Sequence, residues 1–333
     1  MIKFSKSYLN IFKIKEDYIK KNIDELRHVK KINNYYKKQK IRKNCKICFK
    51  KLKNPLINSF GVDYFFCRNC DHLNGKYEDT PKFHDFLYSG KGKLNFGKIY
   101  LKNYEKILKN IHYPKVKFLK SIIKKKINLL DFGAGAGHFV KACLNHKINA
   151  WALEENYQLY KFSKTKIKER SLYAAQNNLE KVIKKFNINC LSLIFVLEHL
   201  PNPHYIFDLF KKTQLEYLYI SVPLASPLIF FENIFQNVYP RHLGGAHTHL
   251  FTENSILYLK KKYKFKIIGE WWFGTEFADL YRSLIVSYKG KNNSTKKIYK
   301  SKIDKIFLNT LDNLQTVFDK QKLSSEVHLV IKK

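Results

Sequence analysis

The residues with the clearest chemical meaning lie between positions 129 and 137, where an apolar run leads into Asp131 and then into Gly133, Gly135 and Gly137. Glycine lets a backbone turn sharply and approach a ligand closely, because it has no Cβ atom. The apolar residues that follow predict a helix whose first N–H groups have no partner within the helix and can face the same ligand. The segment therefore predicts a strand, a glycine loop and a helix that together bind a nucleotide-like cofactor.

The spacing of the glycines excludes two common types of nucleotide loop. A phosphate-binding P-loop requires a Lys-Ser/Thr pair after its last glycine, and this chain has none there. A dinucleotide loop requires a third glycine or alanine three positions after the second, where this chain has His138 or Val140.

A second cofactor element is expected at the end of the next predicted strand, residues 148–153, which is followed by Glu154 and Glu155. A carboxylate about twenty residues after the loop can accept hydrogen bonds from both ribose hydroxyls of a nucleoside. Glu154 comes first after the strand and is chosen for this role, while Glu155 suits the N-terminus of the next helix. The alternative is that both are solvated loop acids.

A third element combines a buried strand over 191–196 with the sequence Leu197-Glu198-His199-Leu200 and a Pro-x-Pro break. With the Asp-x-Gly-x-Gly-x-Gly loop, this Val-Leu-Glu-His-Leu-x-x-Pro pattern resembles class I S-adenosylmethionine (SAM) methyltransferases of the methyltransferase domain 23 type. Relatives of that type methylate ubiquinone precursors, deoxysugars and similar small molecules. Such proteins usually have Asp before this strand, where this chain has Asn189, so we assign Asn189 no cofactor role.

The resemblance implies a SAM site and a set of residues that contact the cofactor. These are Asp131, Gly133, Ala134, Gly135, Gly137, Glu154, Phe195 and Glu198. In such proteins the histidine at the position of His199 is more often structural than catalytic.

The segment expected to select the methyl acceptor is the aromatic stretch 230–252, which contains three histidines. Its sequence His247-Thr248-His249-Leu250-Phe251-Thr252 is similar, though loosely, to the His-x-His-x-x-Phe-Ser/Thr region of sugar C-methyltransferases. The resemblance implies that His249 or His247 lies near the methyl group and acts as a base. Histidine has a suitable pKa for this task. The alternative is that these histidines bind backbone groups of the loop.

A second motif precedes the cofactor region and consists of Cys45, Cys48, Cys67 and Cys70 in two C-x-x-C pairs separated by eighteen residues. Two close pairs of thiolates can surround one tetrahedral Zn²⁺. Four cysteines leave no open coordination position, so the sequence predicts a structural zinc. A catalytic zinc and a redox pair are the alternatives.

The order of the predicted elements indicates an α/β fold with a doubly wound, mostly parallel, seven-stranded sheet of the Rossmann-like methyltransferase type. The strands are expected at 127–132, 149–153, 171–174, 191–196, 217–222, 265–271 and 327–331. We divide the chain into a basic helical arm (1–40), a zinc-ribbon-like module (41–78), a helical bridge (79–125) and the SAM-dependent methyltransferase domain (126–333).

The net charge of +36 raises the question of a nucleic-acid partner. Of the 63 basic residues 57 are lysines, and the abundance of Lys, Asn, Ile, Tyr and Phe is typical of an AT-rich genome. Between 186 and 259 the basic residues are only Lys211, Lys212 and Arg241, although an enzyme acting on nucleic acid should line its active site with phosphate contacts. We therefore expect a small metabolite, nucleotide sugar or surface glycan as acceptor, with an RNA methyltransferase as the alternative.

The chain has no run of about 18 apolar residues, so we expect no membrane span. Its first thirty residues are charged throughout and lack the apolar segment of a signal peptide, which predicts a cytoplasmic location.

Overall fold

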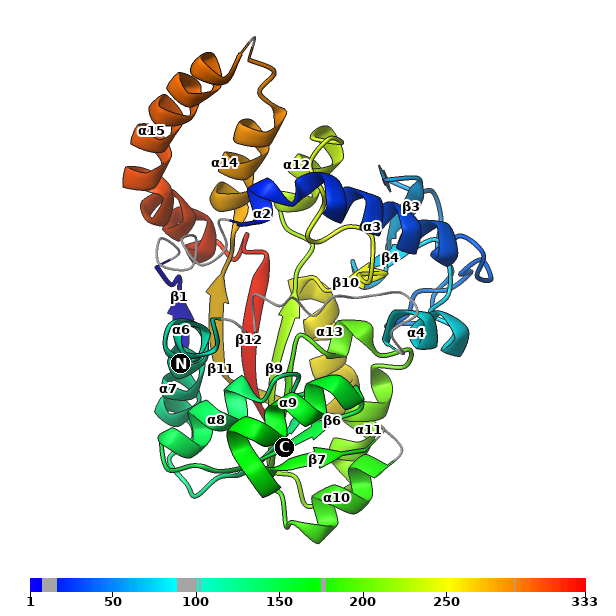
Figure 1. Ribbon diagram of the computed structural model, residues 1–333. Coiled ribbons are helices and arrows are strands. Elements are labelled where there is room, and N and C mark those ends of the chain that lie inside the picture. The colour runs from blue at the N-terminus through cyan, green and yellow to red at the C-terminus, as the bar shows by residue number, and fades with distance from the viewer. Residues whose placement is uncertain (8–16, 89–100, 102, 175–177, 291) are drawn as a thin grey trace.

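The computed structural model describes residues 1–7, 17–88, 101, 103–174, 178–290 and 292–333. Its main feature is an eight-stranded sheet with helices on both faces (Figure 1). The strands in spatial order are β1 (Ile2–Phe4), β11 (Lys266–Phe273), β12 (Glu326–Lys332), β9 (Tyr217–Pro223), β8 (Cys190–Ile194), β5 (Asn128–Phe132), β6 (Asn149–Glu154) and β7 (Ser171–Tyr173).

Strands β5 to β9 are parallel to one another, whereas β12 is antiparallel to both β9 and β11. These seven strands are the ones expected from the sequence. The eighth, β1, pairs in parallel with β11 at the sheet edge, through the partners Ile2–Glu270 and Phe4–Trp272. The residues of β1 fall in the stretch for which the sequence indicated a helical arm, and three residues are too few to show an alternating pattern.

Neighbouring residues of the central strands point to opposite faces of the sheet and join different cores. One face carries a core built with α6 (Tyr104–Ile107), the π-helical turn Leu108–His112, α7 (Tyr113–Ile122), α8 (His138–Asn145) and α9 (Tyr157–Ile167). The other face packs against α10 (Leu179–Lys185), α11 (His204–Lys212) and α13 (Glu253–Tyr263). Leu129 belongs to the first core and Leu130 to the second.

A second sheet of four strands has the order β10-β4-β3-β2, with β2 (Ile57–Ser59), β3 (Val62–Phe66), β4 (Leu73–Gly75) and β10 (His249–Leu250). Around it lie α3 (Asn22–Tyr36) and α4 (Pro81–Tyr88), whose buried side chains share one core with the sheet (Figure 1). Strand β10 belongs to the stretch 230–252 that is expected to select the methyl acceptor, which we call the acceptor segment. Residues 41–78 alone therefore do not complete this sheet.

The remaining helices of the described ranges are α2 (Asp17–Lys20), α12 (Leu228–Ile234), α14 (Glu276–Ser287) and α15 (Asn293–Lys320), with short 3₁₀ turns at Lys168–Arg170 and Leu197–His199. Helix α15 extends outward beside α14 (Figure 1). A search of the described ranges finds no helix that combines the length and the apolar character needed to cross a bilayer.

Candidate active site and cysteine cluster

The glycine loop follows β5 and has the left-handed backbone that its sequence suggests. The φ angles are +69° at Gly133, +56° at Gly135 and +76° at Gly137. A Cβ atom at Gly133 would lie 2.7 Å from Cγ2 of Val196, whereas one at Gly135 would meet nothing within 4 Å. Gly133 is therefore required for packing, while Gly135 borders open space that a ligand can enter.

The carboxylate of Glu154, at the end of β6, holds this loop in place. Its Oε2 accepts a hydrogen bond of 2.7 Å from the N–H of Gly135, and its Oε1 accepts one of the same length from the N–H of Asn156. Burial raises the pKa of Glu154, and these backbone donors oppose that effect by stabilising the charged form. Carboxylate oxygens have further lone pairs and can still accept hydrogen bonds from hydroxyl groups.

A cavity of about 330 Å³ lies beside the glycine loop. Its walls come from α4, the ends of β5 and β6, the glycine loop, the start of α9, the turn after β8 and the acceptor segment. The residues are His84, Tyr88, Phe132, Gly133, Gly135, Glu154, Glu155, Asn156, Leu159, Phe195, Val196, His199, Leu200, Ala246 and His247. Four of the expected cofactor residues are thus on the wall, and Phe195 stands there with a left-handed φ of +56°.

The other four residues expected to contact the cofactor lie outside this wall. Asp131 is buried in β5 and its Oδ1 accepts a 2.6 Å hydrogen bond from Ser192 Oγ, while burial raises its pKa to about 7. Ala134 donates its N–H to Leu153 O at 3.2 Å, and Gly137 precedes α8, where a Cβ would lie 3.0 Å from Ser163 Cβ. In this structure these residues shape the loop.

The fourth residue, Glu198, is completely buried beneath the cavity, next to His199. No other described residue forms a hydrogen bond to either of its carboxylate oxygens, and its Oε1 lies 3.8 Å from His199 Nε2. Burial raises the pKa of Glu198 to about 8. A buried carboxyl without other partners retains its proton at neutral pH. It becomes a carboxylate beside the imidazole only at higher pH.

Two histidines from different segments meet on the cavity wall. The rings of His199 and His247 are stacked with centroids 5.1 Å apart and an interplanar angle of 28°. Burial lowers the pKa of His199 to about 3 and that of His247 to about 4. Both rings are therefore neutral at physiological pH, and burial makes each a weaker base than an exposed imidazole. With Glu198 they also place three ligand atoms within 4.8 Å of one another, a spacing that can hold a divalent cation.

The two histidines expected as bases have different surroundings. His247 lines the cavity, but His249 lies in β10, completely buried, with its Nδ1 2.9 Å from His72 Nε2. Burial lowers the pKa of both His249 and His72. The ring of His249 therefore links the acceptor segment to the small sheet, whereas the ring of His247 lies on the cavity wall.

The acceptor segment is held by a buried carboxylate that the sequence did not reveal. Glu232, in α12, accepts hydrogen bonds from the backbone N–H groups of Arg241, His242 and Leu243, at 2.5, 2.9 and 2.9 Å. Burial raises the pKa of Glu232 to about 7, and these donors favour its ionised form. These hydrogen bonds attach the loop that carries His247 to α12.

Helix α4 supplies His84 and Tyr88, which sequence reasoning missed. Their ring centroids lie 4.6 Å apart, and both residues line the cavity. The only signal in the sequence is a polar and an aromatic residue four positions apart, which puts them on one face of a helix. That spacing does not indicate which cavity the face will meet.

The four cysteines gather at the junction of the small sheet with the core around α11 and α13. The Sγ atoms of Cys45 and Cys70 are 3.6 Å apart, and those of Cys48 and Cys67 are 3.3 Å apart. Tetrahedral Zn–S bonds of about 2.3 Å require sulfurs separated by about 3.8 Å. All four sulfurs lie within 4.8 Å of one another, so the donor set and its compactness fit Zn²⁺.

Both cysteine pairs sit in turns of the same geometry. The N–H of Phe49 donates to Cys45 O at 3.0 Å, and the N–H of Asp71 donates to Cys67 O at 2.7 Å. Phe49 and Asp71, each directly after a pair, have left-handed φ angles of +62° and +58°. The repeated turn brings two pairs of thiols to one point, as expected for a shared metal.

Comparison with known families identifies the class of protein. The sequence model of a methyltransferase domain family matches residues 101–270, which include the glycine loop, Glu154 and the segment with His199 and His247. The chain belongs to this methyltransferase domain family. It is a SAM-dependent methyltransferase, with the Rossmann-like fold expected from the sequence.

Three solved structures with a similar fold are distant from this chain in sequence. A SAM-dependent methyltransferase from Archaeoglobus fulgidus is 15% identical, covering 70% of this chain and 100% of that one, with a TM-score of 0.42. A putative methyltransferase from Bacillus halodurans is 13% identical, covering 66% and 97%, with a TM-score of 0.39. Phosphoethanolamine N-methyltransferase 2 from Haemonchus contortus, in complex with SAM, is 14% identical, covering 78% and 62%, with a TM-score of 0.43. The search of curated proteins gave no match.

Proposed function

We propose that this methyltransferase acts on a small metabolite, nucleotide sugar or surface glycan, and that the cavity beside the glycine loop is its reaction site. The observation that carries the proposal is that one cavity brings together the glycine loop, Glu154 and the His199–His247 pair. Glu154 would accept the ribose hydroxyls of SAM, and Phe195 would provide an apolar wall for the cofactor.

The methyl group of SAM is electrophilic because it is bound to a sulfonium, and the protein must place an acceptor in line with it. We assign His247 as the base for a protonated acceptor. Its imidazole takes the acceptor's proton while the bond from acceptor to methyl carbon forms and the bond from sulfur to carbon breaks. His199 stacks on His247, and the carboxyl group of Glu198 lies 3.8 Å from His199.

The charge of the cavity wall favours a small acceptor over RNA. Among the described residues that line it there is no Lys or Arg, and Glu154 and Glu155 make the wall acidic. A polynucleotide acceptor needs phosphate contacts close to the reacting base. RNA remains the alternative acceptor, and the assay below distinguishes it.

We also propose that the four cysteines hold a structural Zn²⁺. Their sulfurs are buried and form part of a hydrophobic core, and four thiolates fill a tetrahedral site without leaving a position for a substrate. The metal would join the small sheet to the core formed with α11 and α13.

The deciding experiment is transfer of a labelled methyl group from SAM into nucleotide sugars, glycans and RNA. We expect label in a small-molecule or glycan fraction, and a His247→Asn variant that binds SAM normally should lose it. Label confined to RNA, with transfer abolished by moderate salt, would contradict the proposed acceptor class. Calorimetry with SAM alone tests the cofactor site independently of the acceptor.

A further inference from the structure

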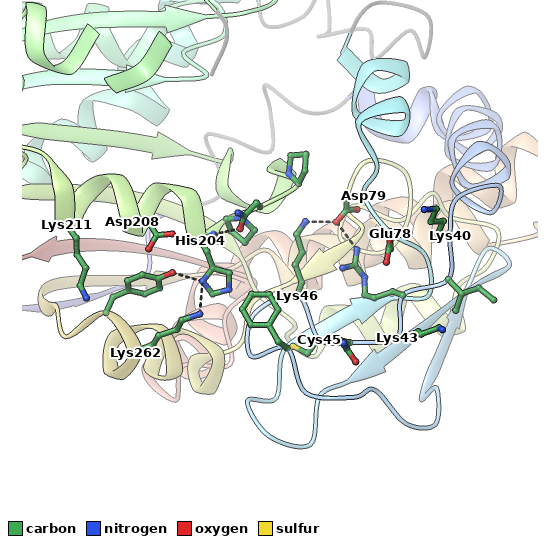
Figure 2. Close-up of a pocket in the computed structure, with 18 residues that line it drawn as sticks. Lys40, Lys43, Cys45, Lys46, Glu78, Asp79, His204, Asp208, Lys211 and Lys262 are labelled. Carbon is green, nitrogen blue, oxygen red and sulfur yellow. Dashed lines mark hydrogen bonds and ion pairs between the residues drawn. The ribbon is translucent and has the colours of Figure 1, made fainter. Parts of the chain in front are cut away.

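A second and larger hollow lies outside the reaction cavity, between residues 41–78, which we call the cysteine module, and helices α11 and α13 (Figure 2). Its volume is about 1190 Å³. We call it the basic cleft, and its walls consist of Lys40, Ile41, Arg42, Lys43, Asn44, Cys45, Lys46, Phe49, Glu78, Asp79, Pro201, Asn202, Pro203, His204, Asp208, Lys211, Lys262 and Tyr263. Figure 2 shows Lys211 and Lys262 on one side of it and Lys40 and Lys43 on the other.

The charges of the basic cleft leave an excess of cations. Six lysine and arginine side chains line it, against three carboxylates. Two of the cations, Arg42 and Lys46, share one carboxylate oxygen, Asp79 Oδ2, at 2.9 and 2.5 Å. Their side chains are 9% and 4% exposed. Two buried cations on one carboxylate strengthen the binding of a second anion beside them.

An aromatic ring stands at the mouth of the same cleft. Phe49 is 58% exposed, although it has the left-handed backbone of the cysteine turn, a conformation that strains a bulky residue. Its ring lies 4.9 Å from that of His204, and Lys262 Nζ lies 4.8 Å from its centroid. His204 is fixed in turn by Tyr263, whose hydroxyl is 2.8 Å from His204 Nδ1. The cleft thus contains the exposed ring of Phe49, which packs against His204 and lies next to the ammonium group of Lys262.

The cleft and the reaction cavity share one loop. His199 and Leu200 line the reaction cavity, and Pro201, Asn202 and Pro203 line the basic cleft. A ligand in the cleft would therefore lie beside the site of methyl transfer without occupying it.

We propose that the basic cleft is a binding site for a nucleoside phosphate. The planar base would stack on Phe49, and the phosphate groups would face Lys211 and Lys262, which lie on the same side of the cleft (Figure 2). A ligand with both a planar ring and two or more negative charges uses both features of the cleft, whereas a simple anion uses only the charges. The chemistry is shared by a free nucleotide, such as the carrier of a nucleotide sugar, and by a single strand of nucleic acid.

Calorimetric titration at low salt, without SAM, tests this proposal apart from any methyl transfer. The probes are UDP, inorganic pyrophosphate and a twelve-residue oligouridylate. We expect saturable binding of UDP, and pyrophosphate should bind at least fivefold more weakly because it lacks the ring. Tighter binding of the oligouridylate, with a steeper loss of affinity with salt, would assign the site to a nucleic-acid strand.

Variants locate the binding in the cleft. Phe49→Asn removes the ring and keeps a residue that tolerates a left-handed φ, so the cysteine turn should persist. We expect it to weaken binding of UDP or of the oligonucleotide by about 5- to 100-fold. The matched control is Phe230→Asn, at a residue of α12 that is 50% exposed. The double variant Lys211→Ala, Lys262→Ala should weaken all three probes, and its control is the exposed pair Lys297→Ala, Lys302→Ala in α15.

Thermal melting and zinc content establish that each variant is folded. The proposal is overturned if neither UDP nor the oligonucleotide binds, or if their binding is unchanged in the folded Phe49→Asn protein. It is overturned as well if pyrophosphate binds as tightly as UDP. Because no arm requires methyl transfer, an inactive but nucleotide-binding protein would contradict the proposed function and leave the cleft standing.

Discussion

The Nε2 atom of His72 lies 2.9 Å from Nδ1 of His249, and this contact joins the cysteine module to the segment that carries His247. The two rings are buried, and the strands that carry or flank them pair through Leu73–Leu250 and Asn74–His249. Two histidines only two positions apart in the acceptor segment therefore have separate tasks. His249 fixes the segment, and His247 faces the reaction cavity.

This difference predicts opposite results for two similar variants. His247→Asn should lower kcat by about 10²- to 10⁴-fold, the usual effect of removing a general base, with little change in stability. His249→Asn should destabilise the fold by about 1–3 kcal/mol through loss of a buried hydrogen bond, and keep most of the activity of the folded fraction. Thermal melting with initial rates would show this, and the reverse pattern would assign the base to His249.

The glycine loop allows a similarly sharp comparison. Gly135→Ala should fold with a loss of about 1 kcal/mol from its left-handed φ, but weaken SAM at least tenfold because the new methyl enters the space beside the loop. Gly133→Ala places a Cβ 2.7 Å from Val196, so it should destabilise the protein more, by about 1–3 kcal/mol beyond the strain. Equal SAM affinity of Gly135→Ala and the parent protein would show that the cofactor lies elsewhere.

Variants of two adjacent acids, Glu154 and Glu155, test the proposed contact with the ribose of SAM. Glu154→Gln should weaken SAM by about 10- to 100-fold, because a charge-assisted hydrogen bond contributes about 1.5–3 kcal/mol. Glu155→Gln is the control, since its carboxylate is 36% exposed and forms no hydrogen bond to the glycine loop that the described structure records. Calorimetry with SAM gives both affinities, and a larger loss in Glu155→Gln would reverse the assignment.

Loss of the metal from the cysteine cluster should lower the stability of the fold and leave the affinity for SAM nearly unchanged. Cys45→Ser or a strong chelator should release one zinc per chain and lower the melting temperature, because the metal joins two buried turns. SAM affinity of the protein that stays folded should change less than about threefold. Loss of SAM binding or of chemistry in a fully folded, zinc-free protein would contradict a purely structural metal.

The buried carboxyl of Glu198 predicts an unusual pH dependence. Its pKa is raised to about 8, so the side chain is protonated below that pH and a carboxylate above it. The carboxylate lies 3.8 Å from His199 and increases the proton affinity of the histidine pair. The rate of methyl transfer should therefore rise through about pH 8, and Glu198→Gln, which keeps the neutral form, should lack this rise. The same inflection in the variant would assign it to another group.

The sequence predicted the central sheet well because each strand has a strong local signal. The seven expected strands follow apolar runs, and the loop between β5 and α8 follows from three glycines. The pairing of β10 with β4 could not be predicted in this way. Its two residues, His249 and Leu250, have no alternation to read, and they meet their partners only through the packing of the whole acceptor segment.

The same limit applies to the site. Gly133, Gly135, Glu154 and Phe195 could be identified because they lie within one motif or directly after a strand. His84 and Tyr88 reach the cavity from α4, and Glu232 binds a loop about ten residues away. Such roles depend on distances between elements, and spacing along the chain does not contain them.

The placement of β10 has a consequence for how this protein is made. The cysteine module emerges early during synthesis, but the fourth strand of its sheet lies about 175 residues further along the chain. Until that strand arrives, the backbone groups of β4 have an open edge, and open edges bind other strands. A truncated chain that ends before Leu250 should therefore expose this edge, and the module is best studied as part of the whole protein.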